Sequence, residues 1–352
     1  MTKVEKIKGC LVGTAVGDAI GLPREGLSRR RAERMFGNGP LQHAMLLGRG
    51  LCSDDTEHTV MVAQALIAAR LEPKAFLRDF SRRLRWWFLR IPAGVGFGTL
   101  RACMKLWMGC SPDRSGVASA GNGPAMRSAI LGLVADSQVN LEDLVHASTS
   151  VTHSDSRALE GAMVVASLAQ LVATSDGHTL SMDEVSERIL PVVNDRQFRS
   201  DLNVALDAVE QSQAPDQFSE SIGLREGVSG FVVHTVPVAV YCWGNYQGDF
   251  RSAIETAVSM GGDSDTVAAI VGAIAGTQGG LDGIPDEWID DLIEWPCHIS
   301  WLEALADQLG AVAEGGIASE VPQRPALYKL LRNVLFLMIV LVHGFRRLLP
   351  PY

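Results

Sequence analysis

Apolar residues in this chain gather in long runs that are hydrophobic on every side, rather than alternating with polar residues. A segment that is hydrophobic all round is typical of a buried helix, whereas alternation with a period of two would indicate a half-buried strand. Alternating stretches are scarce. The helical runs lie at residues 9–19, 56–71, 126–134, 156–172, 232–243 and 266–277. The pattern therefore predicts an all-α protein.

Glycine is unusually frequent inside these predicted helices. The chain has 35 glycines among 352 residues, and a glycine within a helix costs about 1 kcal/mol relative to alanine. Close approach of helix backbones would offset that cost, so we expect a central layer of small-residue helices. Loops are expected at residues 21–51, 91–124, 175–183, 211–224, 279–286 and 313–324. None resembles an interdomain linker, and we predict one domain over residues 5–312, followed by a linker and apolar helix over 313–352.

The C-terminal segment contains one uninterrupted apolar run, Val334–Val342. A bilayer span takes about 20 apolar residues, so this run is too short to cross. Three interpretations remain: a buried helix, a weak self-association contact, or a helix that lies on a membrane surface. We favour the buried helix.

Charge and cysteine content limit the classes of partner and compartment. The net charge of -9 repels polyanions, and the basic runs are no longer than the one at residues 28–31, so no nucleic-acid partner is expected. The six cysteines form no C-x-x-C pair, which favours buried reduced thiols. The N-terminus lacks the apolar core of a signal peptide. We expect a cytoplasmic protein.

Two acidic clusters directly precede buried helices. One reads Ser53-Asp54-Asp55-Thr56 and the other Asp263-Ser264-Asp265-Thr266. Such residues commonly cap helix N-termini, but one cap needs one side chain and each cluster offers two carboxylates. Buried like charges are unfavourable without a cation. Oxygen-rich clusters suit Mg²⁺, Mn²⁺ or Ca²⁺ rather than zinc, and two clusters could hold two ions about 4 Å apart.

Two further stretches carry weaker signals. Gly121-Asn122-Gly123-Pro124 runs into a predicted helix, where exposed amides could meet a pyrophosphate with help from Arg127; the alternative is a simple turn. His153 precedes another helix and is either a ligand-binding residue or a helix cap or core histidine.

These stretches, taken in order, resemble the ADP-ribosylglycohydrolase family, which includes the dinitrogenase-reductase-activating glycohydrolases and the ADP-ribosyl-acceptor hydrolases. The resemblance runs from about residue 5 to residue 285. The matching stretches are Gly13-Thr14-Ala15-Val16-Gly17-Asp18-Ala19-Ile20-Gly21 with Glu25, residues 53–56, Gly121-Asn122-Gly123 with Met126-Arg127, Thr152-His153, and Gly261-Gly262 with residues 263–266.

The resemblance implies an orthogonal all-α bundle with a binuclear Mg²⁺ or Mn²⁺ centre at the base of an ADP-ribose cleft. The implied metal ligands are Ser53, Asp54, Asp55, Asp263, Asp265, Thr266 and Glu25. The implied catalytic residues are Glu25, Asp54, Asp55 and Asp265. Substrate would contact Gly121, Asn122, Gly123, Met126, His153, Gly230 and Phe231. Glu25 would act as a ligand that swings aside for substrate or as a proton acceptor, and we favour the first role.

The expected activity is release of ADP-ribose from an ADP-ribosylated protein side chain or a small ADP-ribosyl conjugate, through an oxocarbenium-like state at ribose C1″. The alternatives are hydrolysis of an O-acyl-ADP-ribose or a nucleoside, and binding of ADP-ribose without cleavage. The sequence departs from the family pattern at residues 117–120, which lack an acid, and at Phe231, where tyrosine is common. The first departure weighs against an arginine-linked substrate.

Overall fold

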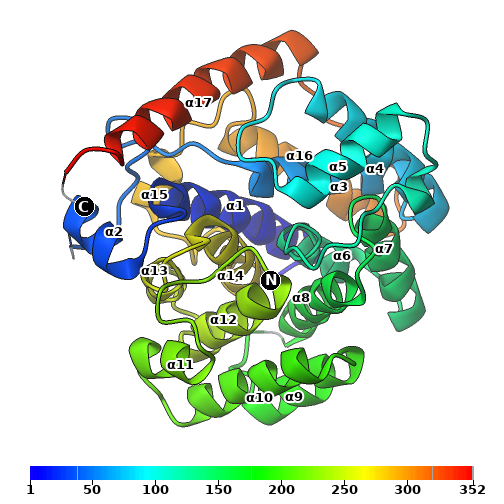
Figure 1. Cartoon of the computed structure of the whole chain (residues 1–352). Helices are drawn as coiled ribbons and strands as arrows, with labels where there is room; N and C mark the ends of the chain where they lie inside the picture. The colour runs from blue at the N-terminus through cyan, green and yellow to red at the C-terminus, as the bar shows by residue number, and fades with distance from the viewer. Residues whose placement is uncertain (38, 176, 319, 351–352) are drawn as a thin grey trace.

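The computed structural model describes residues 1–37, 39–175, 177–318 and 320–350. In these residues all regular secondary structure is helical, which confirms the predicted all-α class, and β pairing is limited to isolated bridges. The α-helices are labelled in Figure 1 and are α1 (Lys3–Gly21), α2 (Arg29–Phe36), α3 (Asp54–Ala69), α4 (Pro73–Phe88), α5 (Phe97–Trp107), α6 (Ala129–Val134), α7 (Gln138–Ser150), α8 (Ser156–Thr174), α9 (Met182–Ile189), α10 (Arg196–Glu210), α11 (Pro215–Ser221), α12 (Val232–Asn245), α13 (Phe250–Ser259), α14 (Ser264–Gly279), α15 (Asp286–Asp290), α16 (Ile299–Ala313) and α17 (Ala326–Arg346).

Helices α1 and α14 form the centre of the molecule and pack against each other more extensively than any other described pair (Figure 1). Their glycines face each other along the contact. A Cβ added at Gly13 would lie 2.1 Å from the carbonyl oxygen of Gly272, and one at Gly9 would lie 1.9 Å from that of Gly276. No larger residue fits at this spacing. The expected layer of small-residue helices is therefore present.

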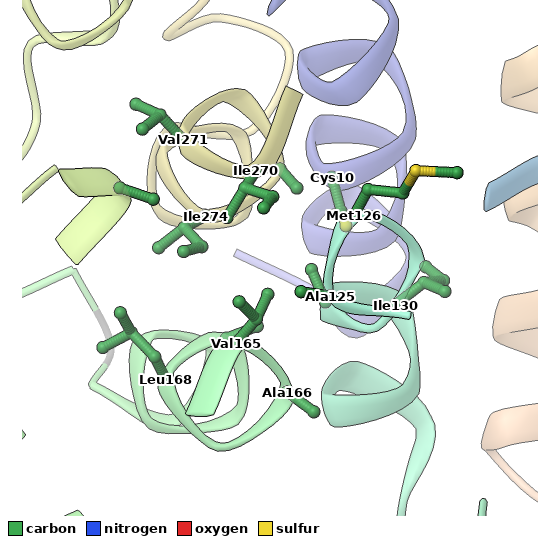
Figure 2. Close-up of a cluster of buried hydrophobic side chains, with 14 of the residues drawn as sticks. Cys10, Ala125, Met126, Ile130, Val165, Ala166, Leu168, Ile270, Val271 and Ile274 are labelled. Atoms are coloured by element: carbon green, nitrogen blue, oxygen red, sulfur yellow. The ribbon is translucent and has the colours of Figure 1, made fainter. Parts of the chain in front are cut away.

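The hydrophobic core continues outward from this pair. Figure 2 shows Ile270 and Ile274 of α14 facing Val165 of α8, with Cys10 of α1 next to Ala125 of the short 3-10 helix η3 (Ala125–Arg127). All six cysteines are free; Cys110 is exposed and Cys297 half-buried, while the other four are buried. The core therefore packs together helices from the first, middle and last thirds of residues 5–285.

Three of the predicted loops contain helices. Helix α2 lies within residues 21–51, α5 within 91–124 and α11 within 211–224. These helices are short and bury only one face. A search for segments that are hydrophobic all round passes over such helices, because their polar residues interrupt the apolar run.

The prediction of a fully buried C-terminal helix was wrong. Helix α17 buries Arg332, Asn333 and Phe336 against the domain, while most of its leucine and valine side chains are exposed. Among the described residues it is the helix long and apolar enough to cross a membrane, and 17% of its most apolar window is buried. The domain therefore covers one side of this helix and leaves its other sides exposed to solvent.

Candidate active site

The two acidic clusters come together at the N-termini of α3 and α14, beside the last turns of α1. Ser53 is the N-cap of α3, and its Oγ accepts a hydrogen bond from the amide of Asp55. Asp263 stands at the N-cap position of α14, but its side chain makes no capping bond. The close packing of α1 on α14 brings the C-terminal half of α1 to the same place. A single site therefore draws on three helices.

Asp18 of α1 lies at the centre of this meeting point and was not among the site residues that we predicted. It is fully buried. Its carboxylate accepts hydrogen bonds from the Ser53 amide at 2.9 Å, the Thr56 amide at 3.1 Å and the Thr56 hydroxyl at 2.5 Å. Asp18 thus holds the first turn of α3 in place. The signal that could have revealed it was a lone acid within residues 9–21 of α1, a stretch that is otherwise glycine-rich and almost entirely apolar.

The carboxylates form two overlapping groups. Oxygen atoms of Asp18, Asp55 and Asp265 lie within 4.8 Å of one another, and so do oxygen atoms of Glu25, Asp263 and Asp265. The Oδ1 atoms of Asp55 and Asp265 are buried and have no hydrogen-bond partner among the described residues. A buried carboxylate oxygen without a partner is unfavourable unless a cation meets it. The donor set therefore fits one or two hard divalent ions.

Electrostatics in the protein without metal agree with that fit. Burial, reinforced by the neighbouring carboxylates, raises the pKa of Asp54, Asp55 and Asp265 well above the usual range. Burial and the charge of Asp263 raise the pKa of Glu25 to about 7, although Arg347 opposes the shift. Crowded carboxylates of this kind bind protons when no cation is present. A bound cation would compete with those protons.

The hydroxyl residues of the predicted ligand set are partly engaged within the cluster. Ser53 Oγ lies 3.0 Å from Asp55 Oδ2, and Thr266 Oγ1 donates to the same oxygen at 3.4 Å. The side-chain amide of Asn122 donates to Asp263 Oδ2 at 2.5 Å and to Thr235 at 3.0 Å. Asn122 consequently connects the glycine loop to the acidic cluster.

A cleft of about 510 Å³ opens above the cluster. Its walls include Glu25, Asp54, Asp55, Asp263, Asp265 and Thr266, together with Gly121, Asn122, Gly123, Met126, His153 and Gly230. Ser53 does not line the cleft; it is buried and its hydroxyl contacts Asp55. Five residues of the segment before and at the start of α5 also line the cleft and were not predicted: Gly94, Gly96, Phe97, Gly98 and Thr99. Their alternating glycines were the available signal.

His153 sits in a cradle of glycines at one side of the cleft. A Cβ at Gly98 would lie 2.8 Å from His153 Nε2, and one at Gly121 would lie 3.0 Å from it. His153 Nδ1 lies 2.8 Å from Thr152 Oγ1, which accepts a bond from Arg127. Because Arg127 only donates, the Thr152 hydroxyl proton can go to His153 Nδ1 at 2.8 Å or to the Thr149 carbonyl at 3.5 Å, and the shorter contact favours Nδ1. This arrangement favours the imidazole with its proton on Nε2, toward the cleft.

Arg127 does not reach the cleft, so the expectation that it helps to bind an anion was wrong. Its side chain is fully buried. It donates to the carbonyl of Gly123 at 3.0 Å, to Thr152 at 2.8 Å and to the carbonyl of Ser148 at 2.9 Å. Arg127 supports the glycine loop and His153 from behind.

The stretch around Gly230 borders the cleft in part. The Gly230 carbonyl accepts a hydrogen bond from the backbone N–H of Asn122 at 3.0 Å. The Phe231 ring is not among the residues that line the cleft; it packs against His234 and under Arg157. The backbone of this segment therefore meets the glycine loop, while its aromatic side chain lies to one side.

The fold and this site define a class of enzyme. Residues 1–318 match the sequence family described as ADP-ribosylglycohydrolase. The chain belongs to that family and is an enzyme of the ADP-ribosylglycohydrolase class. Helix α17 lies beyond the matched residues.

Several relatives span nearly the same length. The chain is 32% identical to a protein of Archaeoglobus fulgidus, over 87% of this chain and 96% of that protein. It is 25% identical to the ADP-ribosylhydrolase ARH3 of Bos taurus, over 81% and 88%, and 26% identical to the ADP-ribosylarginine hydrolase Tri1 of Pseudomonas putida, over 88% and 80%. A solved structure titled as an ADP-ribosylglycohydrolase-related protein complex superposes with a TM-score of 0.65 at 26% identity, over 88% of this chain and 99% of that one.

Proposed function

We propose that this enzyme hydrolyses the glycosidic bond at ribose C1″ of an ADP-ribosylated protein side chain or small ADP-ribosyl conjugate, with the help of bound Mg²⁺ or Mn²⁺. The observation that carries the proposal is the pair of unpartnered, buried oxygens, Asp55 Oδ1 and Asp265 Oδ1, at the floor of a cleft bordered by the glycine loop. Relatives named for hydrolysis of ADP-ribosyl groups support the substrate class.

The metal would be held by Asp54, Asp55, Asp263, Asp265 and Thr266, with Ser53 orienting Asp55 and Asp18 holding the first turn of α3. When bound, divalent ions of this kind polarise ribose hydroxyls and lower the pKa of water. Glu25 reaches the cluster from the segment after α1 and shares a ligand group with Asp263 and Asp265. We assign it the role of a displaceable ligand, because that segment joins α1 to α2 outside either helix.

The glycine-lined part of the cleft would take the ADP portion of the substrate. Gly121 and Gly123 leave room for a backbone-close ligand, and the neutral His153 presents its Nε2 proton to a phosphate or ribose oxygen. Asn122 couples that end of the cleft to Asp263. In the reaction, water oxygen bonds to C1″, the bond from C1″ to the acceptor breaks, and the acceptor leaves with a proton.

The test is single-turnover release of free ADP-ribose from arginine-, serine- and acyl-linked ADP-ribosyl substrates. Each is run with Mg²⁺, with Mn²⁺ and with EDTA, beside the Asp263→Ala/Asp265→Ala variant. We expect metal-dependent release from one linkage, lost in the variant. Release of ADP-ribose that EDTA leaves unchanged would contradict the metal's role, and binding of ADP-ribose without any release would contradict hydrolysis.

A further inference from the structure

Helix α17 presents an apolar face to solvent along its whole length. Its exposed large apolar side chains recur every three or four residues, so that they lie on one side of the helix; they are Leu327, Tyr328, Leu331, Val334, Leu335, Met338, Leu341, Val342 and Phe345, followed by Leu348 and Leu349. We call this set the α17 outer face. Contiguous exposed apolar patches on soluble proteins commonly mark an interaction surface.

The opposite side of α17 is fixed to the domain at both ends. Toward its start, Arg332 donates to Glu294 at 2.7 Å and to the carbonyl of Cys52 at 2.5 Å, and Asn333 donates to the carbonyl of Arg90 at 3.0 Å. Toward its end, His343 Nε2 lies 2.7 Å from the Met45 carbonyl oxygen, and Arg347 donates to the Pro23 carbonyl at 3.2 Å. Crossing a bilayer would break all these contacts and expose Arg332 to lipid. The helix therefore lies flat on the domain.

The charges at the C-terminal end of the α17 outer face are mostly positive. Residues 321–350 contain no aspartate or glutamate; Arg332 is buried in its pair with Glu294, whereas Arg346 is exposed and Arg347 half-buried at the end of the helix. Helix α2, with its run of arginines at residues 29–31, lies beside the end of α17 (Figure 1). Arg31 donates to the carbonyl of Arg347, and the guanidinium of Arg346 stacks over Phe36. In a chain of net charge -9, this is a local basic region.

We propose that the α17 outer face docks on an anionic lipid surface, with the helix parallel to the membrane plane. An apolar face bordered by arginines is what such a surface binds, since the apolar side chains enter the acyl boundary and the arginines meet the headgroups. A second copy of the chain fits less well. Its outer face would offer arginines and no carboxylate. This inference does not depend on the proposed hydrolysis.

The docked orientation would also bear on the active site. Arg347 touches the Pro23 carbonyl, and Pro23 belongs to the short helix η1 (Leu22–Arg24) that immediately precedes Glu25. The basic end of the α17 outer face is therefore the end next to the acidic cluster. Docking would hold the cleft at a fixed height near the membrane.

The test is co-flotation of the full chain with vesicles of phosphatidylcholine alone or mixed with phosphatidylglycerol. Val342 and Val139 offer a matched pair, because both are exposed valines on helices, at 65% and 69%, and Val139 lies on α7. We expect binding to the anionic vesicles that weakens with added salt, and about tenfold less binding for Val342→Glu. Val139→Glu should bind as the wild type does. Thermal melting of each variant checks that it is folded.

Failure of the wild-type chain to float with anionic vesicles would overturn the proposal, as would equal losses in the two valine variants. Sedimentation velocity without vesicles supplies a third outcome. A concentration-dependent dimer that Val342→Glu abolishes, in a chain that does not float, would mean that a second copy covers the face.

Discussion

Gly13 of α1 and Gly272 of α14 face each other with no room for a side chain on either: a Cβ on each would lie 2.1 Å from the other's carbonyl oxygen. This contact sets the distance between the two central helices, and so it sets where Asp18 of α1 lies relative to Asp265 of α14. The active-site cluster depends on glycines that lie outside it.

Replacing Gly13 or Gly272 with alanine should destabilise the protein by about 3 kcal/mol, because backbone meets backbone and neither helix can yield locally. Denaturant unfolding measures the loss. Gly279→Ala is the matched control, since it is also in α14 and nothing lies within 4 Å of an added Cβ. A neutral Gly13→Ala variant would contradict this packing argument.

Asp18→Asn should weaken metal binding by about 10- to 100-fold, because the asparagine amide would point a donor at a site filled by the Ser53 and Thr56 donors. Titration calorimetry with Mn²⁺ measures the affinity, and circular dichroism checks the fold. Unchanged Mn²⁺ affinity in a folded Asp18→Asn protein would show that Asp18 does not position the ligands.

Added Mn²⁺ should raise the thermal midpoint of the EDTA-treated protein. Saturation at 100-fold above the dissociation constant corresponds to about 2.7 kcal/mol of added stability. Asp265→Asn should lose most of the shift, since it removes a carboxylate shared by both ligand groups. Asp282→Asn, an exposed loop substitution, should keep it. A shift of equal size in both variants would place the metal elsewhere.

His153 should remain neutral far into the acid range, because burial, and then the charge of Arg127, lower its pKa to about 3. The unfolded chain takes up this proton near the ordinary histidine pKa of about 6.5. Between those two values the unfolded state binds more protons, so this residue's contribution to stability falls as the pH falls. Ring nitrogen shifts measured by NMR from neutral pH to about 4.5 should stay constant and report the Nε2 tautomer; a titration near 6 would contradict the burial.

Arg332→Met should loosen α17 from the domain. The substitution leaves Glu294 buried at 5% exposure without its partner, and losing one member of a buried pair typically costs about 3–5 kcal/mol. Limited proteolysis should then cut near α17 faster than in the wild type. Adding Glu294→Leu should restore much of the resistance. Arg82→Met, which breaks an exposed pair with Asp79, is the control and should change little.

The sequence by itself determined the fold class, the central layer of small-residue helices and the two acidic clusters. Each of these features is visible within a short stretch of sequence: runs that are apolar on all sides, glycines inside those runs, and paired carboxylates at the start of a helix. The glycine loop and His153 were weaker signals in the sequence, the family resemblance added Glu25, and the cleft contains all of them.

Only the tertiary structure decided how these parts combine. Asp18 belongs to the site because the glycine contact holds α1 against α14, and there Asp18 also meets the start of α3, where it binds the amide of Ser53, 35 positions away in the chain. Arg127 is buried behind the loop because its partners come from α7 and the segment after it. Helix α17 is largely exposed because the domain covers only the side of the helix that carries Arg332, Asn333 and Phe336. The local sequence does not show how much of a helix its neighbours will cover.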